Sequence, residues 1–549
     1  MSARDRLTEL DAVPRLRARD VSLFSDDPDL RIPVMQRLGW TDLAGKAAGR
    51  LPLLTGLADA LVQEGATDLL LLGMGGSSLA PLVIERIIGG GHGFPRLHVL
   101  DTTSPVQVAG LLSELSPEST YAIVASKSGT TIEPLSLYAI VSAWYAEAGL
   151  NRAEAGRHVI VITDPGSPLE KLRQRDMLRI ALTAPATVGG RYSALSVFGL
   201  TPAALAGIHL PALIQRAQAM EAACDAPVED NPAALLAAWM VDARDAGRDK
   251  LTFVTSERYA PFGLWAEQLV AESLGKNGMG IVPVIETAPA GPDGYGPDRA
   301  FVVLRFTDDE PLAEWSRSTA AAHPVYELTV TDVFDIGAEF VRWEHAIALA
   351  GVLLGVNPFD EPSVTEAKRA TSAILEGGAS SVPAATADIG GTWVTYAGTL
   401  EPRSPSSRVE AIAGAYAALQ PGDYLTLLVY APDDAERLDP LVDAAATVSH
   451  TTRAAVCLEL GPRYLHSTGQ LHKGGPNTGV FILVTGRDRD DVPVPGKPYG
   501  LAALHRAQAE GDLVTLAQHG RRVLRLDLPS TTPAALAALA DELVAAAHH

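Results

Sequence analysis

The feature that most limits how this chain can fold is a repeating pattern of short apolar runs, each closed by a polar turn. Such runs are present at residues 68–73, 97–100, 121–126 and 158–163. Apolar runs of this length without polar alternation are typical of strands buried on both faces. Helical segments, 79–88 and 135–148, follow the first and third runs. Strands that alternate with helices in this way form right-handed βαβ units, so we predict a doubly wound parallel sheet.

The same pattern restarts near residue 250 and again after residue 408. In the second region we predict strands at 251–255, 280–284 and 300–306 and helices at 261–274 and 337–354. In the third region we predict strands at 423–430, 453–459 and 479–485 and a final helix at 533–547. Residues 376–408 lie between these regions and are rich in Gly, Ser and Pro, which is typical of a linker.

These patterns predict an α/β protein built from several parts. At about 100–200 residues per domain, a chain of 549 residues is expected to hold about three to five domains. We expect an N-terminal helical segment (1–50), a first α/β domain (51–205), a second α/β domain (206–385) and a C-terminal α/β unit (386–549).

Composition excludes several classes of protein. The chain has 65 acidic and 44 basic residues, and its formal charge of -21 repels nucleic-acid backbones and anionic membrane surfaces. The longest apolar run, 346–356, is too short to span a bilayer, and the charged N-terminus does not resemble a signal peptide. Cys224 and Cys457 cannot form a disulfide framework. We therefore predict a soluble cytoplasmic enzyme without nucleic-acid or membrane partners.

Two polar turns follow predicted strands of the first region, at the sheet edge where open α/β sheets bind ligands. They are Gly75–Ser78 and Ser126–Thr131. Glycine lets the backbone approach a ligand, a helix N-terminus offers free N–H groups, and hydroxyl groups donate to phosphate oxygens. The alternative is ordinary helix capping by Ser and Thr. Because the second turn holds more hydroxyl groups than a helix cap needs, we favour anion binding. The turn does not have the P-loop sequence GxxxxGK[ST].

Three charged residues elsewhere could carry chemistry, although each also has a structural explanation. Arg191 follows two glycines and could stabilise an oxyanion or simply lie on the surface. Glu272 ends an apolar helix and could be a proton-transfer base or form a salt bridge with Lys276. Lys368 could be a solvated lysine near a helix start.

His466 and His472 lie in a stretch rich in His and Gly between predicted strands. Their spacing does not match a pair of ligands on one helical face, and acidic or Cys ligands are not near them in the sequence. We therefore predict no metal site.

Short segments of the chain, in family order, resemble those of the glucose-6-phosphate isomerase family, and the first α/β region resembles a sugar isomerase (SIS) domain. The segments are GMGGSSLAP (73–81), SKSGTTIEP (126–134), VGGRYSALSVFGL (188–200), AESLGK (271–276) and VNPFDEPSVTEAK (356–368). Together they cover about residues 60–390. The resemblance implies two SIS-type parallel sheets plus the C-terminal α/β unit. Residues 461–481 are similar to the end of fused transaldolase/glucose-6-phosphate isomerase proteins, and no transaldolase-like segment is present.

The resemblance implies a role for each matched residue. Glu272 corresponds to the base that moves a proton between C1 and C2, Arg191 to the group that stabilises a cis-enediolate, and Lys368 to the lysine that assists ring opening. The residues implied to hold or line the sugar-phosphate pocket are Ser126, Ser128, Thr130, Thr131, Gly76 and Ser77.

The chain departs from the family pattern in two places. The interval that usually contains the ring-opening histidine, here residues 291–299, has none. The sequence His466-Ser-Thr-Gly-Gln470 fits the family's His-x-x-x-Gln pattern far downstream, so we predict that the C-terminal unit supplies His466; His472 is its nearest rival. In the lysine motif, Glu, Ser and Thr replace the usual Gln, Gly and Glu at positions 361, 363 and 365.

The activity that the resemblance implies is interconversion of glucose 6-phosphate and fructose 6-phosphate by a cofactor-free homodimer. Two alternatives stay open. The first is an isomerase that also accepts mannose 6-phosphate. The second is a noncatalytic SIS-type sugar-phosphate sensor, although such a sensor would have no need of Arg191, Glu272 and Lys368 in their motifs.

Overall fold

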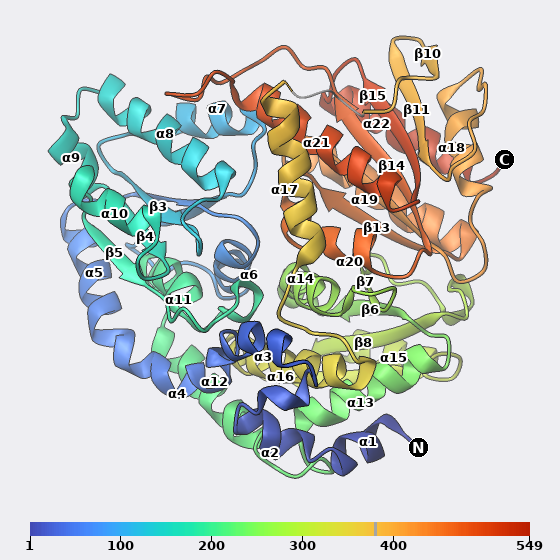
Figure 1. The fold of residues 1–549 in the computed structure, drawn as a ribbon, viewed down its shortest axis with the longest axis horizontal. Coiled ribbons are helices and arrows are strands. Elements are labelled where there is room, and N and C mark those ends of the chain that lie inside the picture. The colour runs from blue at the N-terminus through green and yellow to red at the C-terminus, as the bar shows by residue number, and fades with distance from the viewer. Residues whose placement is uncertain (378–381) are drawn as a thin grey trace.

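The protein is built around three β-sheets, seen in a computed structural model that describes residues 1–377 and 382–549 (Figure 1). The first sheet lies at the upper left of Figure 1, the third at the upper right and the second below them. Short N-terminal helices lie in the lower part of Figure 1: α1 (Ala3–Glu9), α2 (Ala12–Arg17), α3 (Pro28–Met35) and α4 (Leu43–Ala47). These helices lie within residues 1–50, for which we predicted a helical segment.

The first sheet is wholly parallel, with the strand order β2-β1-β3-β4-β5. Its strands are β1 (Asp68–Leu72), β2 (Arg96–Leu100), β3 (Thr120–Ala125), β4 (Val159–Thr163) and β5 (Ile180–Thr183). The helices of this region are α5 (Leu51–Gln63), α6 (Leu79–Ile88), α7 (Pro105–Glu114), α8 (Ile132–Glu147), α9 (Arg152–Arg157), α10 (Pro168–Arg175) and α11 (Val197–Leu205). Leu69 and Leu71 enter one core and Leu70 and Leu72 another, which explains the unbroken apolar run.

The second sheet is also parallel, with the order β7-β6-β8-β9. Its strands are β6 (Lys250–Thr255), β7 (Val282–Ile285), β8 (Arg299–Phe306) and β9 (Val325–Val330). The helices are α12 (Leu210–Ala223), α13 (Pro232–Asp245), α14 (Phe262–Leu274), α15 (Glu310–Thr319) and α16 (Ile336–Leu354). Its core is continuous with one face of the first sheet, so α14, which carries Glu272, is fixed relative to the first sheet.

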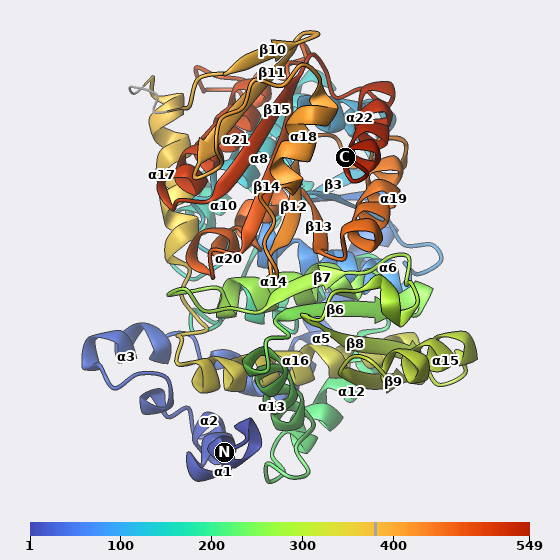
Figure 2. The same ribbon diagram turned by 90° about the vertical axis from the view of Figure 1, so that its right-hand side faces the viewer.

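The third sheet is mixed, with the order β10-β11-β15-β14-β12-β13. Its strands are β10 (Ala387–Ile389), β11 (Thr392–Gly398), β12 (Tyr424–Val429), β13 (Ala455–Leu460), β14 (Gly479–Gly486) and β15 (Arg522–Leu528). The helices are α17 (Pro362–Leu375), α18 (Arg408–Tyr416), α19 (Ala435–Thr452), α20 (Gly469–Gly474), α21 (Leu501–Gln518) and α22 (Pro533–Ala546). Figure 2 shows this sheet standing directly above the second.

The linker predicted for residues 376–408 is wrong for residues 387–398. Strands β10 and β11 form an antiparallel hairpin there, and β11 pairs with β15. Gly390 and Gly391 both have positive φ, as a two-residue hairpin turn requires. Residues 378–381 of the predicted linker lie outside the described residues. Among the helices that the structure describes, none is long and apolar enough to cross a membrane.

Candidate active site

The polar turns predicted to bind an anion open onto one cavity of about 720 Å³. It lies at the carboxyl ends of β1 and β3, opposite α14, α17 and the 3₁₀ turn η9 (Arg463–His466). Every residue predicted for the site lines this cavity except Thr130. The predicted residues that line it are Gly76, Ser77, Ser126, Ser128, Thr131, Arg191, Glu272, Lys368 and His466. Groups far apart in the sequence therefore share one cleft.

The turn between β3 and α8 offers hydroxyl groups that do not cap the helix. Thr131 is the N-cap residue of α8, but its side chain makes no capping hydrogen bond. Instead its Oγ1 accepts a hydrogen bond from Ser126 Oγ at 3.0 Å. The N–H groups at the start of α8 and these hydroxyls can together bind an anion. Thr130 points its hydroxyl at Ser128 Oγ, 2.9 Å away, and stays exposed outside the cavity.

Two glycines allow the first polar turn to touch the segments that carry Arg191 and His466. A Cβ on Gly76 would lie 2.1 Å from the carbonyl oxygen of Gly190, so a side chain does not fit there. Gly75 has a φ of 54°, and a Cβ on it would lie 2.7 Å from the carbonyl oxygen of His466. Both close approaches require bare backbone. The Gly75–Ser78 turn therefore holds one wall of the cavity.

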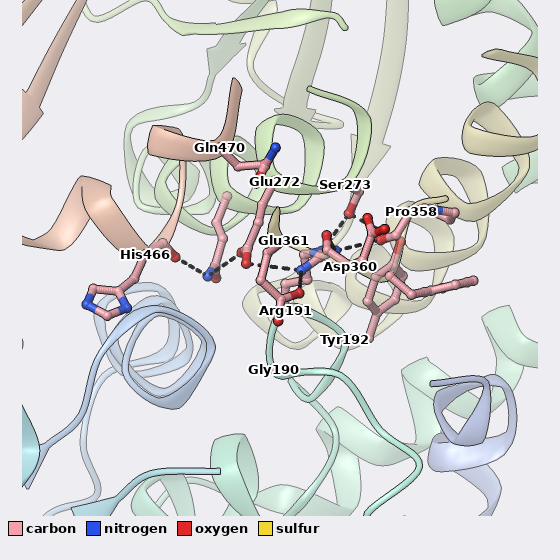
Figure 3. A network of polar contacts seen from close by, with 12 residues as sticks. Gly190, Arg191, Tyr192, Glu272, Ser273, Pro358, Asp360, Glu361, His466 and Gln470 are labelled. Carbon is pink, nitrogen blue, oxygen red and sulfur yellow. Dashed lines mark hydrogen bonds and ion pairs between the residues drawn. The ribbon is translucent and has the colours of Figure 1, made fainter. Parts of the chain in front are cut away.

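Arg191 is buried in a network that draws on three segments (Figure 3). Its Nη1 lies 3.0 Å from Glu272 Oε1 and 3.2 Å from Glu361 Oε2. Its remaining N–H groups donate to Ser273 Oγ at 2.9 Å and to the carbonyl oxygens of Pro358 and Asp360 at 2.7 and 2.9 Å. Burial opposes the charge, but the two carboxylates outweigh burial and raise the pKa of Arg191. The guanidinium is thus fixed in place and charged.

Glu272 lies in the last turn of α14, within reach of Arg191. Gln268, one turn earlier, donates through Nε2 to Glu272 Oε2 at 3.1 Å and to the carbonyl oxygen of His466 at 2.7 Å. Burial raises the pKa of Glu272; Arg191 opposes this effect and Glu361 adds to it. A carboxylate whose pKa is raised is a stronger proton acceptor.

The alternative salt bridge between Glu272 and Lys276 is not formed in the described part of the chain. Lys276 Nζ instead lies 2.7 Å from Asp360 Oδ1. Burial is the main cause that lowers the pKa of Lys276 to about 8. Glu272 therefore faces the cavity with Arg191, and Lys276 stabilises the turn before α17.

His466 reaches the cavity from the third region of the chain and pairs with Glu133. His466 Nε2 lies 2.8 Å from Glu133 Oε1, and Gln508 of α21 donates to the same oxygen at 2.7 Å. Burial alone would raise the pKa of Glu133, but His466 outweighs burial and lowers it. An ionised Glu133 accepts a hydrogen bond from the imidazole and so orients it. His472, the rival, does not line the cavity; its Nε2 lies 3.3 Å from Glu459 Oε1 in a buried position.

The segment before Lys368 departs from the family pattern and makes specific contacts. Gln470 accepts a hydrogen bond from the Ser363 backbone N–H at 2.9 Å and donates to the carbonyl oxygen of Gly275 at 3.1 Å. This side chain therefore ties the start of α17 to the end of α14. Lys368 follows on α17, exposed at the cavity wall.

Three functional-site residues were not predicted from the sequence: Glu133, Gln268 and Gln508. Glu133 stands inside the segment SKSGTTIEP, so the motif itself could have indicated it. Gln268 lies one helical turn before the predicted base, a spacing that places both side chains on one face. Gln508 had no sequence signal because its position depends on how α21 packs against the first region. Among described residues, no group of three or more His, Cys, Asp or Glu could hold a metal ion.

Comparison with known proteins agrees with this geometry. The family model described as phosphoglucose isomerase matches residues 55–291. Glucose-6-phosphate isomerase of Rubrobacter xylanophilus is 29% identical over 410 residues, which cover 66% of this chain and 92% of that protein. Glucose-6-phosphate isomerase of Synechococcus sp. (strain JA-2-3B'a(2-13)) is 32% identical over 356 residues, which cover 56% of this chain and 66% of that protein.

Solved structures show the same likeness. A hypothetical protein from Thermus thermophilus has a TM-score of 0.59 and 28% identity, covering 68% of this chain and 96% of that one. A glucose-6-phosphate isomerase from Chlamydia trachomatis has a TM-score of 0.51 and 20% identity, covering 66% of this chain and 78% of that one, and shows the shared fold. The motifs, the cavity that unites them and these relatives together show that the chain belongs to the phosphoglucose isomerase family.

Proposed function

We propose that this protein interconverts glucose 6-phosphate and fructose 6-phosphate. The observation that carries the proposal is the single cavity, which presents hydroxyl and N–H donors from the Ser126–Thr131 turn together with Glu272, Arg191 and His466. Binding energy from the phosphate, which does not react, can position C1 and C2 of the sugar against these side chains.

In the proposed mechanism, ring opening comes first. His466 moves a proton between the ring oxygen O5 and the hydroxyl at O1, with Lys368 assisting at the cavity wall. The contact with Glu133, 2.8 Å from His466 Nε2, stabilises the imidazolium that forms when His466 accepts a proton.

Proton transfer follows on the open chain. Glu272 removes the proton from C2, the electron pair forms the C1–C2 double bond, and the negative charge develops on oxygen as a cis-enediolate. Arg191, held 3.0 Å from Glu272, offsets that charge, an interaction stronger in the transition state than in the ground state. A proton passes from the hydroxyl on C2 to O1, Glu272 returns its proton to C1, and the C2 carbonyl of the ketose forms.

The proposed reaction needs no metal or organic cofactor, because every proton and charge is handled by side chains of the cavity. We also propose a cytoplasmic enzyme that forms a homodimer. Since His466 and Glu272 meet in the same chain, assembly is proposed to stabilise the protein and not to complete its site.

A coupled assay that follows fructose 6-phosphate to glucose 6-phosphate tests the proposed function. We expect turnover with the purified full chain and without added metal. Tight binding of fructose 6-phosphate without turnover would instead favour the noncatalytic sensor. A parallel assay with mannose 6-phosphate decides whether the active site also accepts that epimer.

Replacing His466 by Ala is expected to slow isomerisation of the cyclic sugar by about 10²-fold, the lower range for loss of a general acid–base group. An open-chain analogue should be affected much less, because it does not need ring opening. His472→Ala is the matched control, since it removes an imidazole from the same stretch outside the cavity. Equal slowing of both substrates would show that His466 has a structural role.

Replacing Glu361 by Gln is expected to move the acidic limb of the pH profile of kcat/KM to lower pH. The active form of Glu272 is ionised, so activity falls as pH drops through its pKa. Burial and Glu361 both raise that pKa, so removing the Glu361 charge lowers it. Glu366→Gln, on α17 but outside the cavity, is the control. Ionisation of the substrate phosphate affects the unaltered protein and both variants equally, so it does not cause a difference between their pH profiles. An acidic limb that does not shift in Glu361→Gln would contradict the argument.

A further inference from the structure

A second cavity, of about 380 Å³, lies between the first and third regions, away from the proposed active site. Its volume is within the range of about 300–1,000 Å³ typical of small-molecule sites. Residues from the start of α7, from α21, from β15 and from the segments at the ends of β12 and β14 line it. The polar side chains among them include Arg506, Arg525, His505, Asp488 and Asp490. The proposed isomerase chemistry uses none of these side chains.

The position of this cavity in the third sheet is one that commonly binds ligands. Strand β12 lies between β13 and β14, so the chain leaves β12 for β13 on one side and returns to β14 on the other. The crevice outside the carboxyl ends of two such strands is the topological switch point of an open α/β sheet. Residues 430–432 and 485–486, which follow or end β12 and β14, line the cavity there.

Arg525 is a buried cation whose terminal nitrogens have weak partners. Its side chain is only 8% exposed. Its Nε donates to Thr485 Oγ1 at 3.2 Å, but its Nη1 and Nη2 lie 3.9 and 3.8 Å from the nearest carboxylate oxygens, those of Glu510 and Asp527. These distances exceed hydrogen-bond length. The guanidinium therefore retains N–H groups that a ligand could use.

Arg506, from α21, adds a second cation to the same cavity. Within the part of the chain that the structure describes, it forms no hydrogen bond or ion pair. Its charge is close enough to Arg525 to add to the effect of burial, which lowers the pKa of Arg525. Two neighbouring guanidinium groups repel each other unless an anion lies between them.

Two of the acidic residues of the lining already accept hydrogen bonds from the protein. Asp488 accepts from the Thr531 hydroxyl at 2.7 Å, and Asp491 accepts from the backbone N–H groups of Val492 and Ala502, both at 2.8 Å. Asp490 is exposed and lines the cavity. A ligand that contacts both arginines would thus place its uncharged donors toward Asp490.

We propose that this cavity binds a small hydroxylated organic anion, whose phosphate or carboxylate group contacts Arg506 and Arg525. The phosphate or carboxylate accepts from the free guanidinium N–H groups, and a hydroxyl donates to Asp490. Such charge-assisted hydrogen bonds are about twice as strong as neutral ones. The site is separate from the Ser126–Thr131 turn, so the proposal goes beyond the isomerase reaction.

Calorimetric titration of the full chain with glycerol 3-phosphate, and separately with glycerate, tests this site. The substitutions Ser126→Ala and Thr131→Val are first introduced to weaken binding at the active-site turn. In that background, Arg506→Ala is expected to reduce affinity at least about tenfold, the loss of one hydrogen bond to a charged group. Arg489→Ala removes an equal charge from an exposed position outside the cavity and should leave affinity within about twofold.

The ligand that binds more tightly identifies the anionic group. Equal affinities in Arg506→Ala and Arg489→Ala, or no binding of either ligand, would overturn the proposal. Titration of the otherwise unaltered chain with glycerol 3-phosphate gives a second measurement, since two sites are expected there and Arg506→Ala should weaken only one of them, at least about tenfold. In the isomerase assay Arg506→Ala should keep its kcat, so the second site and the proposed reaction are tested separately.

Discussion

Replacing Glu272 by Gln is expected to lower kcat by about 10²–10⁴-fold, the range for loss of a positioned general base. Gln keeps the size of the side chain and can still accept a hydrogen bond from Arg191, but it cannot take the C2 proton. Because the proposed phosphate contacts lie in the Ser126–Thr131 turn, binding of the sugar phosphate should change little. The measurements are kcat in the coupled assay and the inhibition constant of a nonreactive sugar phosphate.

Glu344→Gln is the matched control for this variant. Glu344 is also buried and its pKa is raised, by burial first and then by Glu221, but it does not line the cavity. We expect near wild-type kcat in Glu344→Gln. Near wild-type kcat in Glu272→Gln would remove Glu272 from the mechanism.

Replacing Arg191 by Met is expected to have two effects, one on turnover and one on stability. Loss of the group proposed to offset the enediolate charge should lower kcat by about 10²–10³-fold. The substitution also leaves Glu272 and two backbone carbonyls without the partner they now share. Removing one member of a buried ion pair costs about 3–5 kcal/mol of unfolding free energy. Urea unfolding measures the second effect, and the coupled assay in dilute buffer measures the first.

Arg299→Met separates these effects. Arg299 is equally buried and donates to Thr252 and Ser449, but it lies outside the cavity. The Arg299→Met variant should therefore have a lower free energy of unfolding, while its kcat stays near the wild-type value. Similar losses of kcat in Arg191→Met and Arg299→Met would mean that the kinetic effect comes from destabilisation alone.

Much of the first two sheets was predictable because local sequence and tertiary context agree there. The run at residues 68–73 is apolar because both faces of β1 are buried, and the observed strand is Asp68–Leu72. Prediction failed where local composition misled. The glycine-rich stretch around Gly390 and Gly391 suggested a linker, but these glycines supply the positive φ angles of a hairpin turn between β10 and β11. The residues that follow, Trp393 to Tyr396, favour a strand.

The site was predictable only where its residues belong to recognised motifs. The motif around Thr131 indicated the cavity, but the exposure of Thr130 depends on how the turn is oriented. The pairing of His466 with Glu133 depends on contacts between regions, such as the bidentate ion pair of Arg463 with Asp101 at 2.7 and 2.8 Å. Contacts between residues far apart in the chain do not produce a periodic pattern in the sequence, so they could not be predicted from it.

The imidazole of His466 and the carboxylate of Glu272 stand on separate regions of one polypeptide, with Gln268 bridging to the His466 backbone at 2.7 Å. If the third sheet moved outward, the imidazole of His466 would leave the cavity, while the Ser126–Thr131 turn and Glu272 would stay together. Under the proposed mechanism the sugar phosphate would still bind, but only molecules already in the open form would react. The rigidity of the contact between Gln268 and the His466 backbone would therefore determine whether the protein can use the cyclic form of the sugar.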